Sequence, residues 1–541
     1  MMRSLLAVDR QKRNPVYRKG GSMNYQIFSE NEWVYPDSRI DEGGRKKAEL
    51  YAARRSDVCF QILTDIPLTG GEAFASEAAD LPCGAEVSQL LPVLVSENSG
   101  PKTFTTLDYD AVKDFVTRRA PFEVYDITKP VGRKLDGGRA AFYVRLTVPA
   151  DAVPGLYEGT LLLNVGEESL SVPVSLKICN ASVPPLHEAR FHMVNWIYYP
   201  RLAAQYGAEP WSKEYLDLLG RFLDNELDMR NDCLMIPAGE PVRDEGGTVV
   251  DFDFTHAEIV GNLALKKGFS RIMGGFVARF RRWDDPDNYL LWDRDVGCTG
   301  IEAFRQLKLY FRRAWECVLK NGWRERYMQC LVDEPQFPNS LAYRALSGIC
   351  RQSMPGVKIN DPVETTEIAG ACDVWVVKQA VYEKYLADFR RLQDTGEEMW
   401  IYTCGFPAGA TMNRVLDLPL TVSRMPMWMC FKYGCPGFLH WGYHAYTPTE
   451  GMQDVCTEAG NGQKYPAGNA HAVYIGTEGP LYSVRGHLQR AGAQDYELFS
   501  LLPDREAAIR IIEKVCRTFD DYDGAADSFD EARRELLEAL G

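Results

Sequence analysis

The chain has 541 residues, of which 45% are hydrophobic, 25% charged and 11% aromatic, and its formal net charge at pH 7 is −14. This length predicts two or three domains, because a single hydrophobic core rarely extends over so many residues. The acidic balance argues against a nucleic-acid partner and against attraction to an anionic membrane, since both need clustered Lys and Arg.

Residues 1–23 are basic and contain only a short apolar run, residues 5–8. That run is too short for the core of a signal peptide, and no later stretch reaches transmembrane length. The 14 cysteines form no C-x-x-C motif, and several lie in apolar strand-like runs, as free thiols do in a reducing compartment. We therefore predict a disordered basic tail at residues 1–23 of a cytoplasmic protein.

Residues 24–182 predict a β-sandwich. Residues 141–148, AFYVRLTV, alternate apolar and polar side chains, and residues 172–178, VPVSLKI, repeat the alternation. Period-two alternation is typical of half-buried strands, and Gly- and Pro-containing turns separate them. Short strands joined in this way indicate a sandwich of two sheets. The double proline at residues 184–185 marks the end of this domain.

Residues 183–484 alternate short apolar strands with helical stretches. Strand then helix, repeated eight times, is the pattern of a (β/α)8 TIM barrel, although the helix between the fifth and sixth strands is only weakly indicated. Residues 485–541 predict amphipathic helices packed on the outside of the barrel. The predicted strands are residues 191–196, 233–239, 269–276, 328–335, 357–364, 373–379, 399–405 and 437–443, and the predicted helices are residues 211–230, 257–267, 301–320, 339–353, 381–395 and 411–430.

Asp333 and Glu334, in the stretch MQCLVDEP, end the fourth predicted strand of the barrel. In a (β/α)8 enzyme the active site lies at the C-terminal ends of the strands. The chain holds three other Asp-Glu pairs, but two of them run into Gly-Gly turns and one begins a helix. Asp333 and Glu334 are therefore the predicted catalytic residues.

The other strand ends carry side chains that suit a sugar, because aromatic rings stack on sugar faces while polar groups bond to hydroxyls. We predict an oligosaccharide or glycoside as the partner, and neither a cofactor nor a metal, since His440 and His444 have no third ligand nearby. Trp283, in a long insertion after the third strand, either caps the pocket or decorates the loop. The candidate substrate-binding residues are Asn195, Trp196, Asp361, Gln379, Tyr402, Trp441, Tyr443 and His444, with rim packing as the alternative for Asn195 and Trp196 and a helix cap as that for Asp361.

The seventh predicted strand ends in IYTCGFP and has no acid where many barrel glycosidases carry their second carboxylate. One alternative is substrate-assisted catalysis, in which the 2-acetamido oxygen of the substrate attacks the anomeric carbon. That mechanism needs one carboxylate to orient the acetamido N–H and a neighbouring acid to protonate the leaving group, which Asp333 and Glu334 can supply. The other alternative is a glycosidase for a non-acetamido sugar, with Asp361 or another loop acid as nucleophile.

Several stretches resemble glycoside hydrolase family 123 and its uncharacterised relatives. They are LVDEP at residues 331–335, GFLHWGY at 437–443 and GPLYSVRGHLQRAGAQDYELFSLL at 479–502. FQILTD at residues 60–65 and PADAVPGLYEGTLLL at 149–163 are similar to the β-sandwich that precedes the barrel in that family.

This resemblance implies an exo-acting β-N-acetylgalactosaminidase that retains configuration through an oxazolinium intermediate. It implies that Asp333 orients the acetamido group and that Glu334 is the general acid/base. Tyr402 would then contact the acetamido carbonyl, and Trp441 would be a stacking platform.

Two positions depart from the family pattern. Gly486-His487 stand where family members have an acidic residue in an arginine-containing motif, and His444 stands where Asn is common, whereas Arg485, Arg490 and Asp495 match. The departures bear on the sugar that is bound, and they leave open a non-catalytic carbohydrate-binding barrel.

Overall fold

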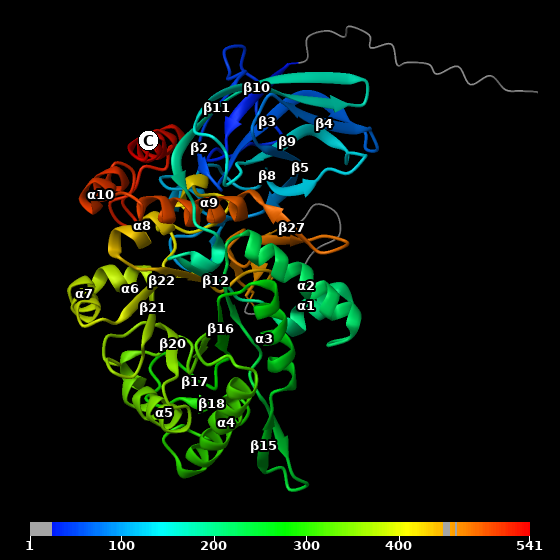
Figure 1. The fold of residues 1–541 in the computed structure, drawn as a ribbon. Coiled ribbons are helices and arrows are strands. Elements are labelled where there is room, and N and C mark those ends of the chain that lie inside the picture. The colour runs from blue at the N-terminus through cyan, green and yellow to red at the C-terminus, as the bar shows by residue number, and fades with distance from the viewer. Residues whose placement is uncertain (1–23, 447–454, 460–461) are drawn as a thin grey trace, which may run out of the picture.

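The computed structural model describes residues 24–446, 455–459 and 462–541. A strand-rich part occupies the top of the view in Figure 1, a barrel the lower part, and the last helices lie beside both. The predicted tail at residues 1–23 lies outside the described residues. A β-sandwich followed by a (β/α)8 barrel and C-terminal helices, the predicted fold class, is confirmed.

The N-terminal part is built on two sheets packed face to face, and the short strands β6 (Asn98–Ser99) and β7 (Thr105–Thr106) pair separately. The strands that it gives to the two sheets are β1 (Tyr25–Ser29), β2 (Ala48–Arg54), β3 (Asp57–Leu68), β4 (Phe74–Ala79), β5 (Gly84–Val95), β8 (Phe122–Pro130), β9 (Gly138–Thr147), β10 (Gly155–Val165) and β11 (Glu168–Ser182). Phe142 and Val144 on β9 are buried between the sheets with Leu161 on β10 and Val172 on β11. The alternation in the sequence thus places the apolar side chains in this core.

Two strands from the C-terminal half complete the larger of the two sheets. They are β26 (Val473–Ile475) and β27 (Pro480–Ser483), from the segment predicted as barrel. The larger sheet has the order β1-β3-β9-β5-β8-β27-β26, and the smaller has the order β2-β11-β10-β4. Tyr482 on β27 pairs antiparallel with Thr128 on β8. The two parts of the chain therefore share a sheet.

The barrel contains eight parallel strands, one in each segment predicted to hold a strand. They are β12 (His192–Asn195), β13 (Cys233–Met235), β16 (Arg271–Gly274), β19 (Tyr327–Gln329), β20 (Lys358–Val363), β21 (Val374–Lys378), β22 (Glu398–Thr403) and β23 (Gly437–His440). Their order is β12-β23-β22-β21-β20-β19-β16-β13, and the end strands β12 and β13 lie side by side. The barrel interior is filled by apolar side chains that include Val194, Met273, Val376 and Leu439.

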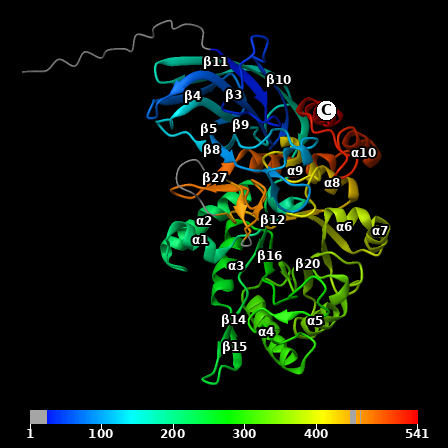
Figure 2. The same cartoon turned by 180° about the vertical axis from the view of Figure 1, so that it is seen from behind.

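Helices surround the barrel (Figures 1 and 2). Within the described residues no helix is long and apolar enough to cross a membrane. Ser212 begins α2 as an N-cap, with its hydroxyl accepting the N–H of Tyr215 at 3.2 Å. The described segment between β20 and β21 contains no helix, as its weak pattern indicated. The helices are α1 (Tyr199–Tyr206), α2 (Lys213–Asp228), α3 (Thr255–Lys267), α4 (Ile301–Lys320), α5 (Ser340–Ser353), α6 (Gln379–Lys384), α7 (Leu386–Asp394) and α8 (Met425–Tyr433).

The helix predicted at residues 411–430 is wrong over its first half. Residues 411–419 are irregular, a short 3-10 turn follows, and α8 begins only at Met425. Pro419 explains the difference, because proline lacks an N–H and disfavours helical backbone in the residue before it.

Three helices end the chain and join the barrel to the sandwich. They are α9 (Val484–Phe499), α10 (Arg505–Glu513) and α11 (Ala526–Ala539). Helix α9 contacts both α8 and β8, and α11 contacts β2 and β11. Every residue of α9 is buried, so this helix lies inside the junction.

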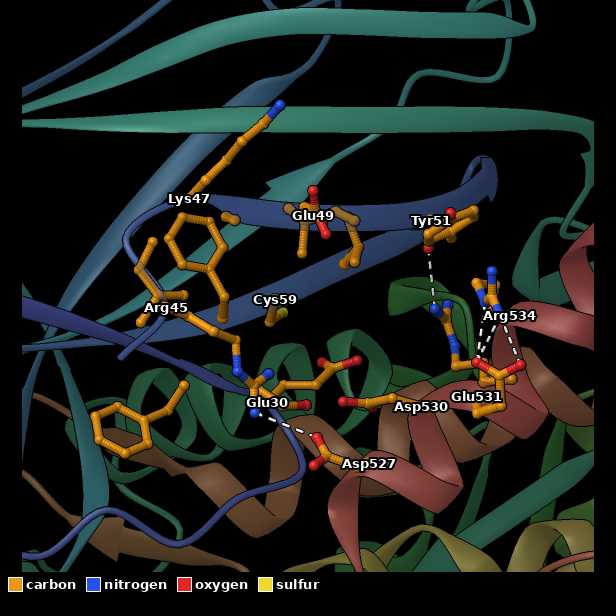
Figure 3. Close-up of a pocket in the computed structure, with 18 of the residues that line it drawn as sticks. Glu30, Arg45, Lys47, Glu49, Tyr51, Cys59, Asp527, Asp530, Glu531 and Arg534 are labelled. Atoms are coloured by element: carbon orange, nitrogen blue, oxygen red, sulfur yellow. Dashed lines mark hydrogen bonds and ion pairs between the residues drawn. The ribbon is translucent and has the colours of Figure 1, made fainter. Parts of the chain in front are cut away.

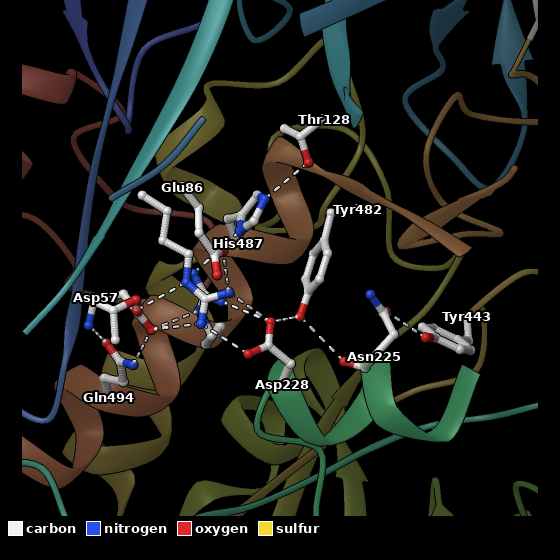
Figure 4. A network of polar contacts seen from close by, with 12 residues as sticks. Asp57, Glu86, Thr128, Asn225, Asp228, Tyr443, Tyr482, His487 and Gln494 are labelled. Carbon is white, nitrogen blue, oxygen red and sulfur yellow. Dashed lines mark hydrogen bonds and ion pairs between the residues drawn. The ribbon is translucent and has the colours of Figure 1, made fainter. Parts of the chain in front are cut away.

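A cluster of four charges, which we call the interdomain charge network, crosses that junction (Figure 4). It consists of Asp57 on β3, Arg145 on β9, Asp228 on α2 and Arg490 on α9. Arg145 binds Asp57 at 3.0 Å and Asp228 at 2.9 Å, and Arg490 binds Asp228 at 3.1 Å. His487, one of the departures from the family pattern, stacks between two tyrosines beside this network, with ring centroids 4.5 Å from each.

Candidate active site

A cavity of about 830 Å³ opens at the C-terminal ends of the barrel strands. Five of the predicted site residues line it: Trp196, Asp333, Glu334, Tyr402 and Trp441. Tyr402 lies on β22, and the other four follow the C-terminal ends of β12, β19 and β23, which converge because all the strands are parallel.

The backbone at Glu334 explains why two consecutive carboxyls face one cavity. In a regular strand, neighbouring side chains point to opposite faces. Glu334 instead has a φ of 54°, in the left-handed region that residues other than glycine seldom adopt. Its N–H donates to Pro362 O at 3.1 Å, and its carbonyl accepts Gln336 Nε2 at 2.8 Å. These bonds hold a strained conformation in the segment that follows β19, as is common in functional sites.

The carboxylate of Glu334 has two donors in the cavity. Tyr402 donates its hydroxyl to Glu334 Oε1, and Lys378 Nζ lies 3.1 Å from the same oxygen. Lys378 also forms an ion pair with Glu364, and its side chain is only 4% exposed. We call Asp333, Glu334, Glu364 and Lys378 the cavity charge cluster.

Asp333 differs from Glu334 in its surroundings. Among the described residues, none donates a hydrogen bond to its carboxyl group. Asp333 is exposed to the cavity, but the surrounding protein atoms leave it less water than a free aspartic acid has. This loss of water, and next the charge of Glu334, raise the pKa of Asp333 above its ordinary value, while Lys378 acts in the opposite direction. The cluster thus keeps a proton to a higher pH than an isolated aspartic acid does.

The sequence-based selection of site residues omits several of the lining residues. Glu364 directly follows β20 and Lys378 ends β21, so both stand at strand ends, where an inventory of every charged residue finds them. Phe104 comes from the N-terminal part, and Tyr465 follows the last barrel strand. No local pattern marks these two rings, whose centroids are 5.4 Å apart. Trp283, left open by the sequence, lines the cavity and is 59% exposed.

Five predicted substrate-binding residues do not line the cavity, because their side chains are buried and bonded elsewhere. Asp361 accepts Leu331 N–H at 2.8 Å and the hydroxyl of Tyr343, on α5, at 2.7 Å, so it faces the outer helices. The other four contacts are Asn195 with Asn231 at 3.0 Å, Gln379 with Met412 O at 3.1 Å, Tyr443 with Asn225 at 2.6 Å and His444 with Gln205 at 2.8 Å.

One group of potential metal ligands lies within the described part of the chain. His192, Asp232 and Cys233 place their ligand atoms within 4.8 Å of one another. They stand at the N-terminal ends of β12 and β13, opposite the cavity. Hydrogen bonds from His192 and Ser270 already occupy the carboxylate of Asp232. The group is thus explained as a hydrogen-bonded cluster.

A second cavity, of about 620 Å³, lies between the sandwich and α11 (Figure 3). Its charged side chains bind one another, as in the pairs Arg45–Asp527 at 3.3 Å and Arg534–Glu531 at 2.5 Å. It contains none of the predicted site residues. The chemistry is therefore sought at the barrel strand ends.

Comparison with known proteins agrees with this choice. A family model described as "Glycoside hydrolase 123, catalytic domain" matches residues 196–502. A solved family 123 glycoside hydrolase from Clostridium perfringens is similar over 96% of this chain and 97% of its own, with a TM-score of 0.75 and 13% sequence identity. No curated protein matches the sequence.

Two other solved structures match less closely. A β-glucuronidase from Parabacteroides merdae covers 79% of this chain and 49% of its own, with a TM-score of 0.31 and 9% identity. An endo-β-1,4-mannanase from Thermotoga petrophila covers 58% of this chain and 78% of its own, with a TM-score of 0.35 and 13% identity. The Clostridium perfringens structure therefore carries the similarity of fold, from the sandwich to the last helices.

Proposed function

Since the chain belongs to glycoside hydrolase family 123, we propose that it is an exo-acting β-N-acetylgalactosaminidase or hexosaminidase that retains configuration. The enzyme hydrolyses glycosidic bonds, and its substrate is a carbohydrate. In the proposed reaction, the 2-acetamido group of the substrate is the nucleophile.

The observation that carries this proposal is the position of Asp333 and Glu334 in one cavity. A retaining glycosidase with its own nucleophile needs a second carboxylate across the scissile bond, about 5 Å from the acid. The lining residues from β22 and the loop after it, Tyr402, Cys404, Gly405 and Phe406, include no acid. A nucleophile from the substrate removes the need for one.

In the first step, the acetamido oxygen attacks the anomeric carbon and the glycosidic C–O bond breaks. Asp333 accepts the acetamido N–H and stabilises the positive charge of the oxazolinium ring. Its carboxyl group suits this role, because none of the described residues competes for it. In this step Asp333 is ionised and Glu334 is protonated, and Glu334 donates its proton to the leaving oxygen. Tyr402 turns its hydroxyl from Glu334 to the acetamido carbonyl when the substrate is bound.

In the second step, water attacks the anomeric carbon from the side that the leaving group has vacated. Glu334, now a carboxylate, takes the proton of that water. The bond between the acetamido oxygen and the anomeric carbon breaks, the acetamido group is restored, and two inversions give net retention. Lys378, at 3.1 Å, stabilises Glu334 while it is ionised.

Aromatic residues provide the proposed platform for the sugar ring. Trp196 and Trp441 line the cavity on two neighbouring strand ends. The ring centroids of Trp441 and Tyr465 are 5.7 Å apart, and the ring of Tyr465 in turn contacts that of Phe104 from the N-terminal part. A wall of rings of this kind suits the apolar face of a sugar.

A second candidate function rests on Glu364. It is a third carboxyl in the cavity, unlike Asp361, which is buried behind it. Glu364 could act as nucleophile in a glycosidase for a non-acetamido sugar.

A panel of aryl glycosides that differ only at C2 tests the proposal. We expect turnover of 2-acetamido glycosides at least about 100-fold faster, in kcat/KM, than that of the matching 2-hydroxy glycosides, because only the former carry the nucleophile. A panel without 2-acetamido preference would overturn substrate assistance and favour Glu364 as nucleophile.

A further inference from the structure

Lys378 is held in an unusual position for a lysine. Its side chain is 4% exposed, and its Nζ lies between the carboxylates of Glu334 and Glu364. The rings of Tyr402 and Phe406 flank the ammonium, with centroids 5.6 and 5.8 Å from Nζ. Burial alone would lower the pKa of Lys378, but its acidic neighbours outweigh burial and raise it, so the group stays charged.

Glu364 is attached to the segment that carries the catalytic pair. Its backbone N–H donates to Pro335 O at 3.3 Å, directly after Glu334. Its side chain is 17% exposed and points to Lys378. Burial and the charge of Glu334 raise the pKa of Glu364, while Lys378 opposes them.

The lining residues of the cavity carry three carboxyls but one ammonium. The other titratable groups there are Tyr198, Tyr402, Cys404 and Tyr465. Burial raises the pKa of each of them, so they are neutral near pH 7. The balance of charge in the cavity therefore depends on Lys378 and on the three acids.

We propose that Glu364 is a positioning residue of the active site, whose carboxylate, fixed in the cavity by its ion pair with Lys378, counteracts that ammonium at Asp333 and thereby sets the pH range in which the enzyme works. This inference rests on the proposed roles of Asp333 and Glu334. Glu364 touches no reacting atom and acts through the effect of its charge on Asp333. Without Glu364, the ammonium loses one of its two anchors, and the cavity loses one negative charge.

The two members of the pair act on Asp333 with opposite signs. The charge of Glu364 raises the pKa of Asp333, and that of Lys378 lowers it. Asp333 must be ionised to accept the acetamido N–H, so its deprotonation governs the acidic limb of kcat/KM against pH. Removing the charge of Glu364 moves this limb to lower pH, and removing that of Lys378 moves it to higher pH.

The test is the pH profile of kcat/KM for Glu364→Gln, Lys378→Met and the double variant, on whichever glycoside the wild type accepts. We expect acidic limbs displaced by about one pH unit in opposite directions, as a charge within a few ångströms produces. In the double variant the limb returns toward the wild-type position. Glu367→Gln is the matched control, because Glu367 is an exposed acid of the same segment, and its profile stays that of the wild type.

Three outcomes overturn the proposal. One is an unchanged limb in Glu364→Gln, and another is displacement of both single variants in the same direction. The third is complete loss of turnover in Glu364→Gln with rescue by azide, which makes Glu364 the nucleophile. If the panel of aryl glycosides shows no 2-acetamido preference, the proposed function fails. The acidic limbs of the three variants are then still measured with the glycoside that the wild type accepts.

A measurement of thermal stability, which does not depend on turnover, tests the same proposal. The pH dependence of the Tm difference between Asp333→Asn and its parent reports the ionisation of Asp333. The proposal predicts that this difference develops at lower pH in the Glu364→Gln background than in the wild-type background. Development at the same pH in both backgrounds overturns it.

Discussion

The interdomain charge network and the cavity charge cluster contain similar groups in different proportions of acid to base. In the network, Asp57 and Asp228, together with the exposed Glu86 at 3.6 Å from Arg145, face two arginines, Arg145 and Arg490. In the cluster, three carboxyls face Lys378 alone. Burial alone would raise the pKa of Asp57, but Arg490 and Arg145 outweigh burial and hold that pKa well below its usual range. The pKa of Asp333 is raised instead.

This difference separates charges that hold the fold together from charges available to a substrate. The carboxylate of Asp57 accepts bonds from Arg145, Thr147 and Gln494. Asp333 accepts none from the described residues. An excess of carboxyls in a cavity is costly, and such groups with perturbed pKa values are concentrated in active sites. The arginine-containing motif that resembles family 123 also contributes to the fold, since Arg485 forms an ion pair with Asp126 at 2.8 Å at the junction.

The largest expected effect is that of Glu334→Gln on turnover. Loss of a general acid should reduce kcat/KM about 1000-fold for a poor leaving group and far less for a dinitrophenyl leaving group, which departs without a proton. Measuring both glycosides on the variant checks this, with Glu367→Gln as the control. Equal losses on both leaving groups would count against the general-acid role.

The next effect is that of Asp57→Asn on stability. The substitution removes one of the two aspartates that bind Arg145 and Arg490, and we expect a loss of about 3 kcal/mol in the free energy of unfolding. Because the pKa of Asp57 is depressed, its contribution is complete above the unfolded pKa, about 4, and is lost as pH falls. The deficit in urea denaturation should therefore be large at pH 7 and should shrink at pH 3.

A matched control for Asp57→Asn is Asp251→Asn, which breaks an exposed pair with Arg313 and should cost less than about 1 kcal/mol. The value of kcat/KM per folded molecule should stay at the wild-type value in both variants. Equal destabilisation by both variants would contradict the structural role of the network.

The smallest effect is that of Asp333→Asn on stability, with the opposite sign. A carboxyl whose pKa is raised in the folded state destabilises that state as pH rises from the unfolded pKa through the folded one. The amide removes this penalty, so Tm should increase on the order of a degree at pH 8, with no increase at pH 3. Solvent in the cavity keeps the effect small. A lower Tm at pH 8 would show that Asp333 has a structural partner.

The barrel and the position of Asp333 and Glu334 at its cavity could be predicted from sequence because their signals are local. Each barrel strand is an apolar run followed, in most cases, by an amphipathic helix, and position along that pattern places Asp333 and Glu334 at a strand end. Parallel strands then bring their ends together whatever the loops do.

The features of the fold and of the cavity that the sequence did not predict depend on contacts between residues far apart in the chain and on local backbone geometry. The pairing of Tyr482 on β27 with Thr128 on β8 leaves no signal in either segment. The sequence also does not predict the direction in which a side chain at a strand end points. Asp361 and Glu364 are both acids near the end of β20, and of these two only Glu364 reaches the cavity. The left-handed backbone conformation of Glu334, which lets the side chains of Asp333 and Glu334 face one cavity, is not indicated by the amino-acid sequence.

The most direct test of the account is inhibition by a thiazoline analogue of the oxazolinium intermediate. If the 2-acetamido group is the nucleophile and Asp333 stabilises the ring, the inhibition constant should lie at least about 100-fold below the KM of the matching aryl glycoside. Asp333→Asn should lose most of that advantage. An inhibition constant no lower than KM in the wild type would contradict substrate-assisted catalysis.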